Sequence, residues 1–171
     1  MSLILIEGID RSGKSTLAKL VAIHMSCGVK HCSKPKTNDP FQEYLMMYDE
    51  TRKYRNLVLD RSHLGEYVYS NLWRGGCRIT NHEFRQLDNL ASLQSAIVIH
   101  AYASVEDIID RCRKVGEDLL KPDQIEKCLQ LFEIAIKNTT LPVYKYDSSK
   151  YTPNQFFEQI KPELTRLREL N

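Results

Sequence analysis

Two glycines, a lysine and a serine near the N-terminus have the spacing of a phosphate-binding loop. Residues 8–15 match the pattern G-x-x-x-x-G-K-[ST], with Gly8, Gly13, Lys14 and Ser15 at its fixed positions. Glycines let the backbone fold around phosphates, the lysine reaches the β and γ phosphates, and the serine hydroxyl suits Mg²⁺. The pattern predicts a binding site for the triphosphate of ATP, or of a close relative, together with Mg²⁺.

The segments on either side of this loop give it the context that the motif requires. Residues 3–6 form a compact apolar run, which is typical of a strand buried on both faces of a parallel sheet. From Lys14 onward, apolar residues recur at helical spacing, and Gly28 is the expected C-terminal stop. That helix would point its positive end at the phosphates. A chance match in a glycine-containing turn is the alternative, but it would not need this strand–loop–helix order.

An aspartate follows a second buried run. Residues 56–59 are typical of a strand, and Asp60 comes directly after them. In open α/β sheets ligands bind at the carboxyl ends of the strands, so this carboxylate could hold the metal directly or through water. The alternative is an N-cap aspartate for the next helix. Beside a phosphate-binding loop we favour metal or substrate contact, and we take Ser15 and Asp60 as candidate metal ligands.

The remaining elements must bring these groups to one edge of a sheet. Strands and helices alternate along the chain, which predicts a parallel sheet covered on both faces by right-handed crossovers. A capping pattern, Thr80 with Glu83, supports one of the helix starts. We predict strands at 3–6, 29–32, 56–59, 96–99 and 143–146, and helices at 14–27, 41–54, 63–72, from 80, 104–113, from 122 and from 152. Without a repeat or a long linker, the chain 1–171 is expected to form a single α/β domain.

Composition narrows the class of protein. The 171 residues carry a formal net charge of +2 and are 42% hydrophobic, so a full core can form and no footprint for duplex nucleic acid is present. The five cysteines show no C-x-x-C spacing, which is typical of reduced thiols rather than of a zinc site. No apolar run approaches the length of a membrane span. We expect a soluble, cytoplasmic protein without a membrane partner, and composition disfavours nucleic acid as a partner.

Two patches of sequence resemble a known family. Residues 6–16 contain Glu-Gly-x-Asp at the start of the phosphate loop, and Leu59-Asp60-Arg61 stands at the end of a predicted strand. This combination resembles the thymidylate kinases and, more broadly, the nucleoside monophosphate kinases and deoxynucleoside kinases. The resemblance implies a P-loop NTPase fold, a three-layer α/β/α sandwich with a five-stranded parallel sheet and a short lid at about residues 114–122. It also implies that the protein forms a homodimer.

The resemblance assigns roles around the donor. Lys14 and Arg11 would stabilise charge on the transferring phosphoryl group, because such catalysis is mostly positioning and electrostatics. Arg111 and Arg113 precede the lid, although cations also suit the end of a helix. The implied ATP-binding residues are Gly8, Asp10, Arg11, Ser12, Gly13, Lys14, Ser15, Thr16, Arg111, Arg113 and Ser148.

Around the acceptor, the resemblance places Asp10 on the sugar hydroxyl and Arg61 on the phosphate, a task suited to a forked guanidinium. Tyr69 and Ser70 fall where the family contacts its acceptor, although Tyr69 could instead pack on a helix face and Arg61 could be a surface ion-pair partner. The implied catalytic residues are Lys14, Arg11, Asp60 and Arg61.

The chain departs from the family after its second strand. The family carries Arg-Glu-Pro or Arg-Phe-Pro there, whereas this chain has residues 33–36, Ser-Lys-Pro-Lys. Lys34 or Lys36 is therefore the candidate replacement for the phosphate-binding arginine, without its bidentate geometry. The aromatic residue that would stack on the acceptor base is not defined by the sequence, and the candidates are Phe41, Tyr44 and Tyr48.

These residues favour a kinase that transfers the γ-phosphate of ATP to a deoxynucleoside monophosphate, and among such acceptors they favour one that resembles dTMP. A deoxynucleoside kinase is the alternative, because Asp60-Arg61-Ser62 also resembles its acidic-Arg-Ser motif. That reaction needs a carboxylate base, and the segment after the second strand has no acid before Asp39. Minor alternatives are a non-metabolic ATP-binding module and, because aromatic residues crowd 41–69, a polynucleotide kinase. The chain lacks the Asn-Lys-x-Asp motif of GTP switches.

Overall fold

The computed structural model describes residues 2–115 and 121–169, and their strands form one five-stranded sheet in which every pairing is parallel. The strand order is β2-β3-β1-β4-β5. The strands are β1 (Ser2–Glu7), β2 (Gly28–His31), β3 (Asn56–Asp60), β4 (Ile97–Tyr102) and β5 (Val143–Asp147). The predicted α/β fold with a five-stranded parallel sheet is confirmed.

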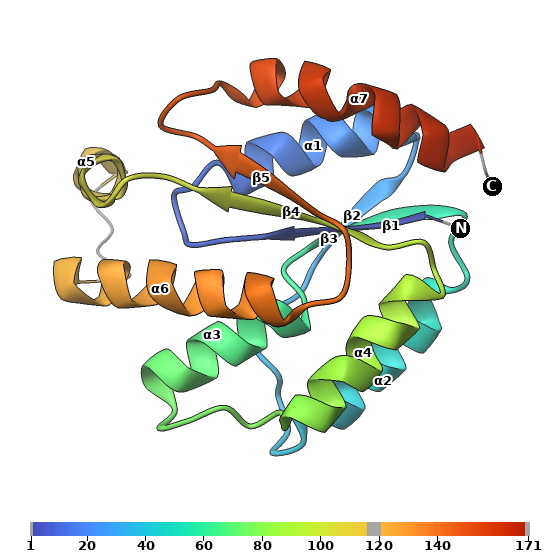
Figure 1. Ribbon diagram of the computed structural model, residues 1–171, viewed down its shortest axis with the longest axis horizontal. Helices are drawn as coiled ribbons and strands as arrows, with labels where there is room; N and C mark the ends of the chain where they lie inside the picture. Colours follow the sequence, from blue (N-terminus) through green and yellow to red (C-terminus); the bar gives the residue numbers. More distant parts are fainter. Residues whose placement is uncertain (1, 116–120, 170–171) are drawn as a thin grey trace.

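Helices cover both faces of this sheet, as Figure 1 shows. They are α1 (Lys14–Met25), α2 (Pro40–Thr51), α3 (His63–Trp73), α4 (Asn81–Ser92), α5 (Val105–Val115), α6 (Pro122–Asn138) and α7 (Pro153–Glu169). α1 and α7 lie on one face, and α2, α3, α4 and α6 lie on the other. α5 is set beyond the tip of β4, near the edge at which β4 and β5 end. The architecture is therefore a three-layer α/β/α sandwich.

The central strand β1 is buried along its whole length because both of its faces are apolar. Ile4 and Ile6 pack in the cluster formed with α1 and α7, whereas Leu3 and Leu5 pack in the cluster formed with α2 and α4. Side chains alternate between the faces of a strand, so a continuous apolar run serves both cores. This burial fixes the carboxyl end of β1, from which the phosphate-binding loop leaves.

Two of the predicted helices end earlier in the structure, and β4 runs on to Tyr102 rather than ending at residue 99. α1 ends at Met25 rather than near Gly28, because Ser26 takes a left-handed conformation with φ 51° and its N–H caps the helix carbonyls. Gly28 instead begins β2 and pairs with Leu57. α2 ends at Thr51, before the predicted end at residue 54. The Thr80–Glu83 capping box of α4 is confirmed.

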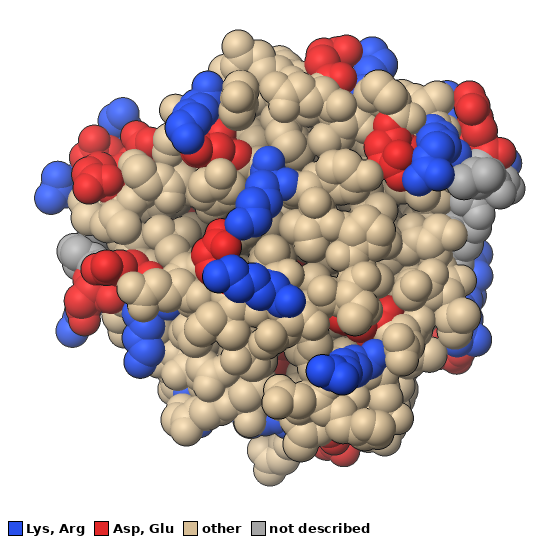
Figure 2. Space-filling view, in the orientation of Figure 1, with Lys and Arg blue, Asp and Glu red and all other residues tan. Residues whose placement is uncertain are grey.

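The surface has no single electrostatic character on the face drawn in Figure 2, where Lys and Arg side chains lie beside Asp and Glu side chains. Of the helices within residues 2–115 and 121–169, none combines the length and the apolar character that crossing a membrane requires.

Candidate functional site

The loop between β1 and α1 is pressed against the backbone of β4. Gly8 has φ 144° and Gly13 has φ 87°, conformations that favour glycine. A β-carbon on Gly8 would lie only 1.9 Å from the carbonyl oxygen of Ala101 in β4. The glycine at the start of the motif therefore allows a close approach between two backbones, and the loop leads directly into α1 at Lys14.

Lys14 lies across this loop. Its side chain is 6% exposed, and its Nζ donates a hydrogen bond to the carbonyl oxygen of Ile9 at 2.6 Å and lies 3.7 Å from Oδ1 of Asp10. Burial lowers the pKa of Lys14, and the negative charge of Asp10 opposes that shift. A buried ammonium is stabilised by further anionic contacts, which makes this position suited to phosphate oxygens.

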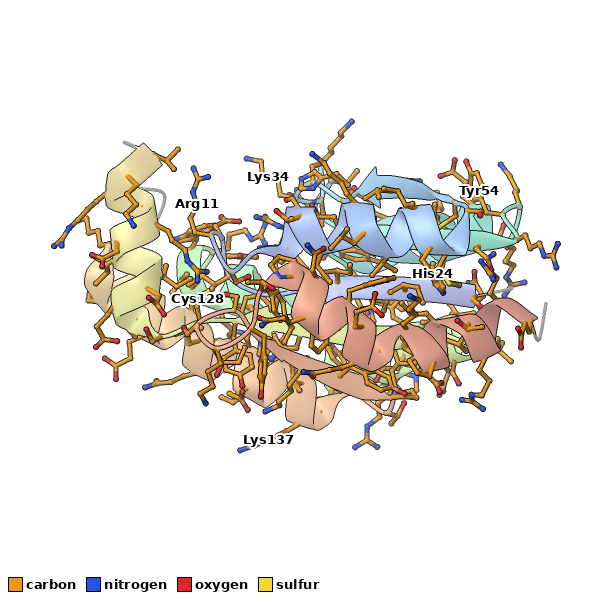
Figure 3. The ribbon with its side chains drawn as sticks, turned by 90° about the horizontal axis from the view of Figure 1, so that it is seen from above. Arg11, His24, Lys34, Tyr54, Cys128 and Lys137 are labelled. Carbon is orange, nitrogen blue, oxygen red and sulfur yellow. The ribbon has the colours of Figure 1, made fainter. Side chains whose placement is uncertain are left out.

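An arginine from α5 joins the phosphate-binding loop to the segment that follows β5. Arg111 donates from Nη1 to the backbone oxygen of Arg11 at 2.9 Å and to Oγ of Ser148 at 2.8 Å, and from Nη2 to the backbone oxygen of Ser148 at 2.8 Å. Arg11 itself has φ 66° and lies between α1 and α5 in the view of Figure 3. Arg111 thus joins three segments, whereas the exposed Arg113 pairs with Asp110 at 3.6 Å.

The predicted lid falls largely outside the described residues. α5 ends at Val115 and α6 begins at Pro122, and residues 116–120 lie outside the part of the chain that the structure describes. Arg113 was predicted to act with this lid, and that role stays a prediction. Its ion pair with Asp110 does not connect it to the phosphate-binding loop.

Three cavities adjoin one another along the carboxyl edge of the sheet. The loop cavity, of about 400 Å³, is lined by residues of the phosphate loop together with His31, Asp60 and Arg61. The β5 cavity, also about 400 Å³, shares Arg11 and Gly13 with it and extends to the segment after β5. The α3 cavity, of about 210 Å³, shares Arg61 with the loop cavity. Arg61 and Arg11 therefore each line two neighbouring cavities.

Asp60 ends β3 beside the loop, as predicted. Its Oδ2 accepts a hydrogen bond from Nδ1 of His31 at 3.1 Å, and its Oδ1 is buried without a hydrogen-bond partner among the described residues. The exposed Ser15, at the start of α1, lines the same cavity. A hydroxyl and a free carboxylate oxygen are hard oxygen donors of the kind that Mg²⁺ prefers, so these residues fit the predicted metal.

His31 was not predicted, because its position depends on the order of the strands. β2 lies beside β3, and the pairing register sets His31 opposite Asp60. The predicted Ser15 and Thr16 are both exposed in the loop cavity. Ser12 is buried, and its hydroxyl has no partner among the described residues.

Arg61 and Asp10, both predicted at the acceptor, are joined by an ion pair. Arg61 has φ 75°, and its guanidinium lies 5.1 Å from the centre of the Tyr69 ring. This guanidinium therefore has an anionic partner on one side and an aromatic partner on the other. Since Arg61 lines both the loop cavity and the α3 cavity, it is not a surface ion-pair residue.

The α3 cavity has aromatic walls. Tyr69 and Trp73 stack with ring centres 5.1 Å apart, and Tyr44 and Lys34 also line the cavity. Three aromatic residues were candidates for stacking on the acceptor base, and of these only Tyr44 lines the cavity as the described residues form it. Phe41 packs against the core, and the hydroxyl of the buried Tyr48 lies 2.7 Å from Nδ1 of His63. A flat aromatic ligand fits such a space.

Ser70 does not line the cavity. It is buried in α3, and its hydroxyl donates to the backbone oxygen of Glu66 at 2.6 Å. The residues that line the cavity one turn before and after it are Glu66 and Arg74, which the sequence analysis did not single out.

The buried carboxyl group of Glu7 accepts hydrogen bonds from the first residues of α3 and from its N-cap. Oε1 of Glu7 accepts hydrogen bonds from Oγ of Ser62 and from the N–H of Gly65, the latter at 3.2 Å. A β-carbon on Gly65 would lie 3.0 Å from Oε2 of Glu7. Burial raises the pKa of Glu7 from 4.5 to about 7. Glu7 therefore exchanges its proton near neutral pH.

We expect the substitution Glu7→Gln to remove a pH-dependent contribution to stability. Because the folded state raises the pKa of Glu7 to about 7, the folded protein holds this proton more tightly than the unfolded chain does. The resulting stability is complete at about pH 4.5 and is lost as the pH rises to about 7. The free energy of unfolding of the wild type relative to Glu7→Gln should fall over that range, measured by urea denaturation, and stay level above it. A difference that does not change with pH would contradict this.

The fold and the loop define the class of this protein: it has the P-loop fold of the nucleoside and nucleotide kinases. The structure of deoxyadenosine kinase from M. mycoides with products dCMP and a flexible dCDP bound is similar over 96% of this chain and 99% of that chain, with a TM-score of 0.65 and 16% identity. Thymidylate kinase from Candida albicans is similar over 97% and 92%, with a TM-score of 0.59 and 21% identity. No family model matches the chain.

Greater similarity is found with the SPβ prophage-derived uncharacterized protein YorR of Bacillus subtilis strain 168. It is 24% identical over 166 residues, which cover 94% of this chain and 97% of YorR. The crystal structure of YorR in complex with phosphorylated GDP has a TM-score of 0.82 and 21% identity over 99% of this chain and 98% of that chain. These comparisons confirm the resemblance and the fold class that the sequence indicated.

Proposed function

We propose that this protein is a nucleoside monophosphate kinase, which transfers the γ-phosphate of ATP to a deoxynucleoside monophosphate. One observation carries the proposal: each carboxylate that lines the loop and α3 cavities, within the described residues, already has a basic partner. Asp10 pairs with Arg61, Asp60 with His31, and Glu66 with two arginines. The free Oδ1 of Asp60 would be taken by the predicted metal, which leaves no carboxylate as the base that a nucleoside 5′-hydroxyl would need. The site therefore suits an acceptor that is already an anion.

We assign the two substrates to the three cavities as follows. ATP would lie with its base in the β5 cavity near Ser148 and its phosphates in the loop cavity, against Lys14 and the N-terminus of α1. Arg61 and Lys34 would hold the acceptor phosphate at the junction with the α3 cavity. The implied homodimer stays a prediction.

Transfer itself would need no covalent step on the protein. An oxygen of the acceptor phosphate bonds to the γ-phosphorus, and the bond from that phosphorus to the β–γ bridging oxygen breaks. Lys14 and Arg11 would stabilise the charge on the transferring group. Mg²⁺, held by Ser15 and Asp60, would offset charge on the β and γ oxygens when bound.

A second candidate, a deoxynucleoside kinase, is favoured by one comparison. Deoxyadenosine kinase from M. mycoides has the higher TM-score, 0.65 against 0.59 for thymidylate kinase. A mass-spectrometric assay with ATP, Mg²⁺ and a panel of nucleosides and nucleoside monophosphates, ribo and deoxy, separates the two. Diphosphates from monophosphates would support the proposal. Monophosphates from nucleosides alone would overturn it in favour of the second candidate.

His31 should act on the metal through Asp60. Its Nδ1 holds Oδ2 of Asp60 at 3.1 Å and leaves Oδ1 for a cation. An asparagine amide nitrogen can take the place of Nδ1, whereas a glutamine amide nitrogen corresponds to Nε2. We therefore expect His31→Gln to weaken Mn²⁺ binding to the protein with a non-hydrolysable ATP analogue by about 10-fold, the low end for an outer-shell partner, and His31→Asn to retain most of it. Electron paramagnetic resonance of free Mn²⁺ measures this without turnover, and equal affinities in both variants would refute it.

A further inference from the structure

Glu66, in the first turn of α3, pairs with Arg74 at the C-terminal end of that helix and with Arg78 beyond it. Oε2 of Glu66 lies 2.7 Å from Nη2 of Arg74, and Oε1 lies 3.1 Å from Nη2 of Arg78. The carboxylate is 1% exposed. A carboxylate paired with two guanidinium groups has no proton to donate, so Glu66 offers acceptor oxygens to any ligand in the α3 cavity.

The three residues differ in their access to that cavity. Glu66 and Arg74 line it, whereas Arg78 does not. Arg78 also donates a hydrogen bond to the backbone oxygen of Thr37 at 3.4 Å. Nε of Arg74 is buried without a partner among the described residues. A guanidinium has five N–H donors and a carboxylate about four lone-pair sites, so both groups have capacity beyond their ion pair.

The cavity therefore presents a donor next to an acceptor, between aromatic walls. Arg74 can only donate and Glu66 can only accept, while Tyr69 and Trp73 provide flat surfaces beside them. Thymine and uracil carry O4 next to N3–H, and guanine carries O6 next to N1–H. Each places a carbonyl acceptor beside an N–H donor, which complements this pair.

Adenine and cytosine carry the reverse pattern, because an amino group stands beside an unprotonated ring nitrogen. Their amino group would face a guanidinium that cannot accept, and their ring nitrogen would face a carboxylate that cannot donate. Buried groups left unpaired in this way weaken binding strongly.

We propose that Glu66 and Arg74 read the base of the acceptor and select the keto bases thymine, uracil and guanine over adenine and cytosine. This assignment rests on the proposed function, because a phosphate held at Arg61 is what places the base in the α3 cavity. Arg78 pairs with the same carboxylate but does not line the cavity.

The test compares dTMP and dGMP with dCMP and dAMP, by calorimetric binding without ATP and by kcat/KM with ATP. The wild type should prefer the keto bases by at least about 10-fold, and Arg74→Met should lower that preference by about 10- to 100-fold, the range for loss of one base-edge contact. Arg78→Met is the matched control, which removes an arginine from the same carboxylate and should keep the preference. Glu66→Gln should lower the preference, because an amide can present either a donor or an acceptor.

A ratio of two acceptors measured on one preparation does not depend on the fraction of folded protein, so weak folding of a variant does not mask the result. A wild-type preference for dCMP or dAMP, or an unchanged preference in Arg74→Met, overturns the base assignment. Keto selectivity in binding without any diphosphate product overturns the proposed function instead. Failure of all four monophosphates to bind overturns both.

Discussion

Replacing Arg11 with alanine should lower kcat for phosphoryl transfer by about 10³-fold, the low end of the effect of an arginine on the transferring phosphate. Arg11 lines both the loop cavity and the β5 cavity, so it lies where the triphosphate would pass from one to the other. The expected loss corresponds to about 4 kcal/mol of transition-state stabilisation. The substrate KM should change much less, since the arginine acts mainly on charge that develops during transfer.

The backbone of this residue makes alanine the informative substitution. Arg11 has φ 66°, and arginine and alanine carry the same β-carbon, so the change removes a charge without altering the cost of that conformation. Arg52→Ala is the matched control, because Arg52 is half exposed at the end of α2 and pairs only at 3.8 Å with Asp49. Turnover by Arg11→Ala at the level of the control would remove Arg11 from the catalytic residues.

The parts of the site that could be predicted from sequence are those that one segment builds alone. The pattern of residues 8–16 lies within one segment and can be recognised without knowledge of the rest of the fold, and the position of Asp60 needs only the strand before it. The sheet followed from alternating apolar runs. The order of its strands did not, because neighbours in the sheet are distant in sequence.

The contacts that could not be predicted from the sequence depend on the order of the strands and on a turn after α3. His31 reaches Asp60 only because β2 lies beside β3. Arg74 reaches Glu66 from the C-terminal end of the same helix, and Arg78 reaches it because the chain turns after α3, near Gly75 and Gly76. Nothing in the spacing of these residues signals the contact, since exposed arginines after a helix are common.

Arg111 shows how tertiary contacts decide between alternatives that the sequence leaves equal. Its position near the end of α5 suits a solvated cation, yet it bonds to the phosphate loop at Arg11 and to Ser148. Arg113, only two residues later, lies on the other side of the helix and is exposed. The periodicity of 3.6 residues per turn separates the two side chains by more than half a turn.

The second large effect is expected on folding. Gly8→Ala should lower the free energy of unfolding by about 4 kcal/mol or more, which is exceptional for one methyl group. The added β-carbon would lie 1.9 Å from the carbonyl oxygen of Ala101 and 2.9 Å from its carbonyl carbon. Both atoms belong to the backbone of β4, which pairs with β1 and β5, so neither can move without disturbing the sheet.

Two other glycines serve as matched controls. The loss of stability should be largest for Gly8→Ala, smaller for Gly13→Ala and smallest for Gly28→Ala. A β-carbon on Gly13 would lie at ordinary contact distance from side chains, 3.4 Å from the Tyr146 ring and 3.7 Å from Cβ of Ser148, but φ is 87° there. Gly13→Ala should therefore cost about 1–2 kcal/mol. Gly28 has open space within 4 Å and no positive φ, so Gly28→Ala should change stability by less than about 0.5 kcal/mol. Urea denaturation of the three variants measures these losses. If Gly8→Ala were no less stable than Gly13→Ala, the phosphate loop could not lie against β4, and the cavities that share its residues would need another arrangement.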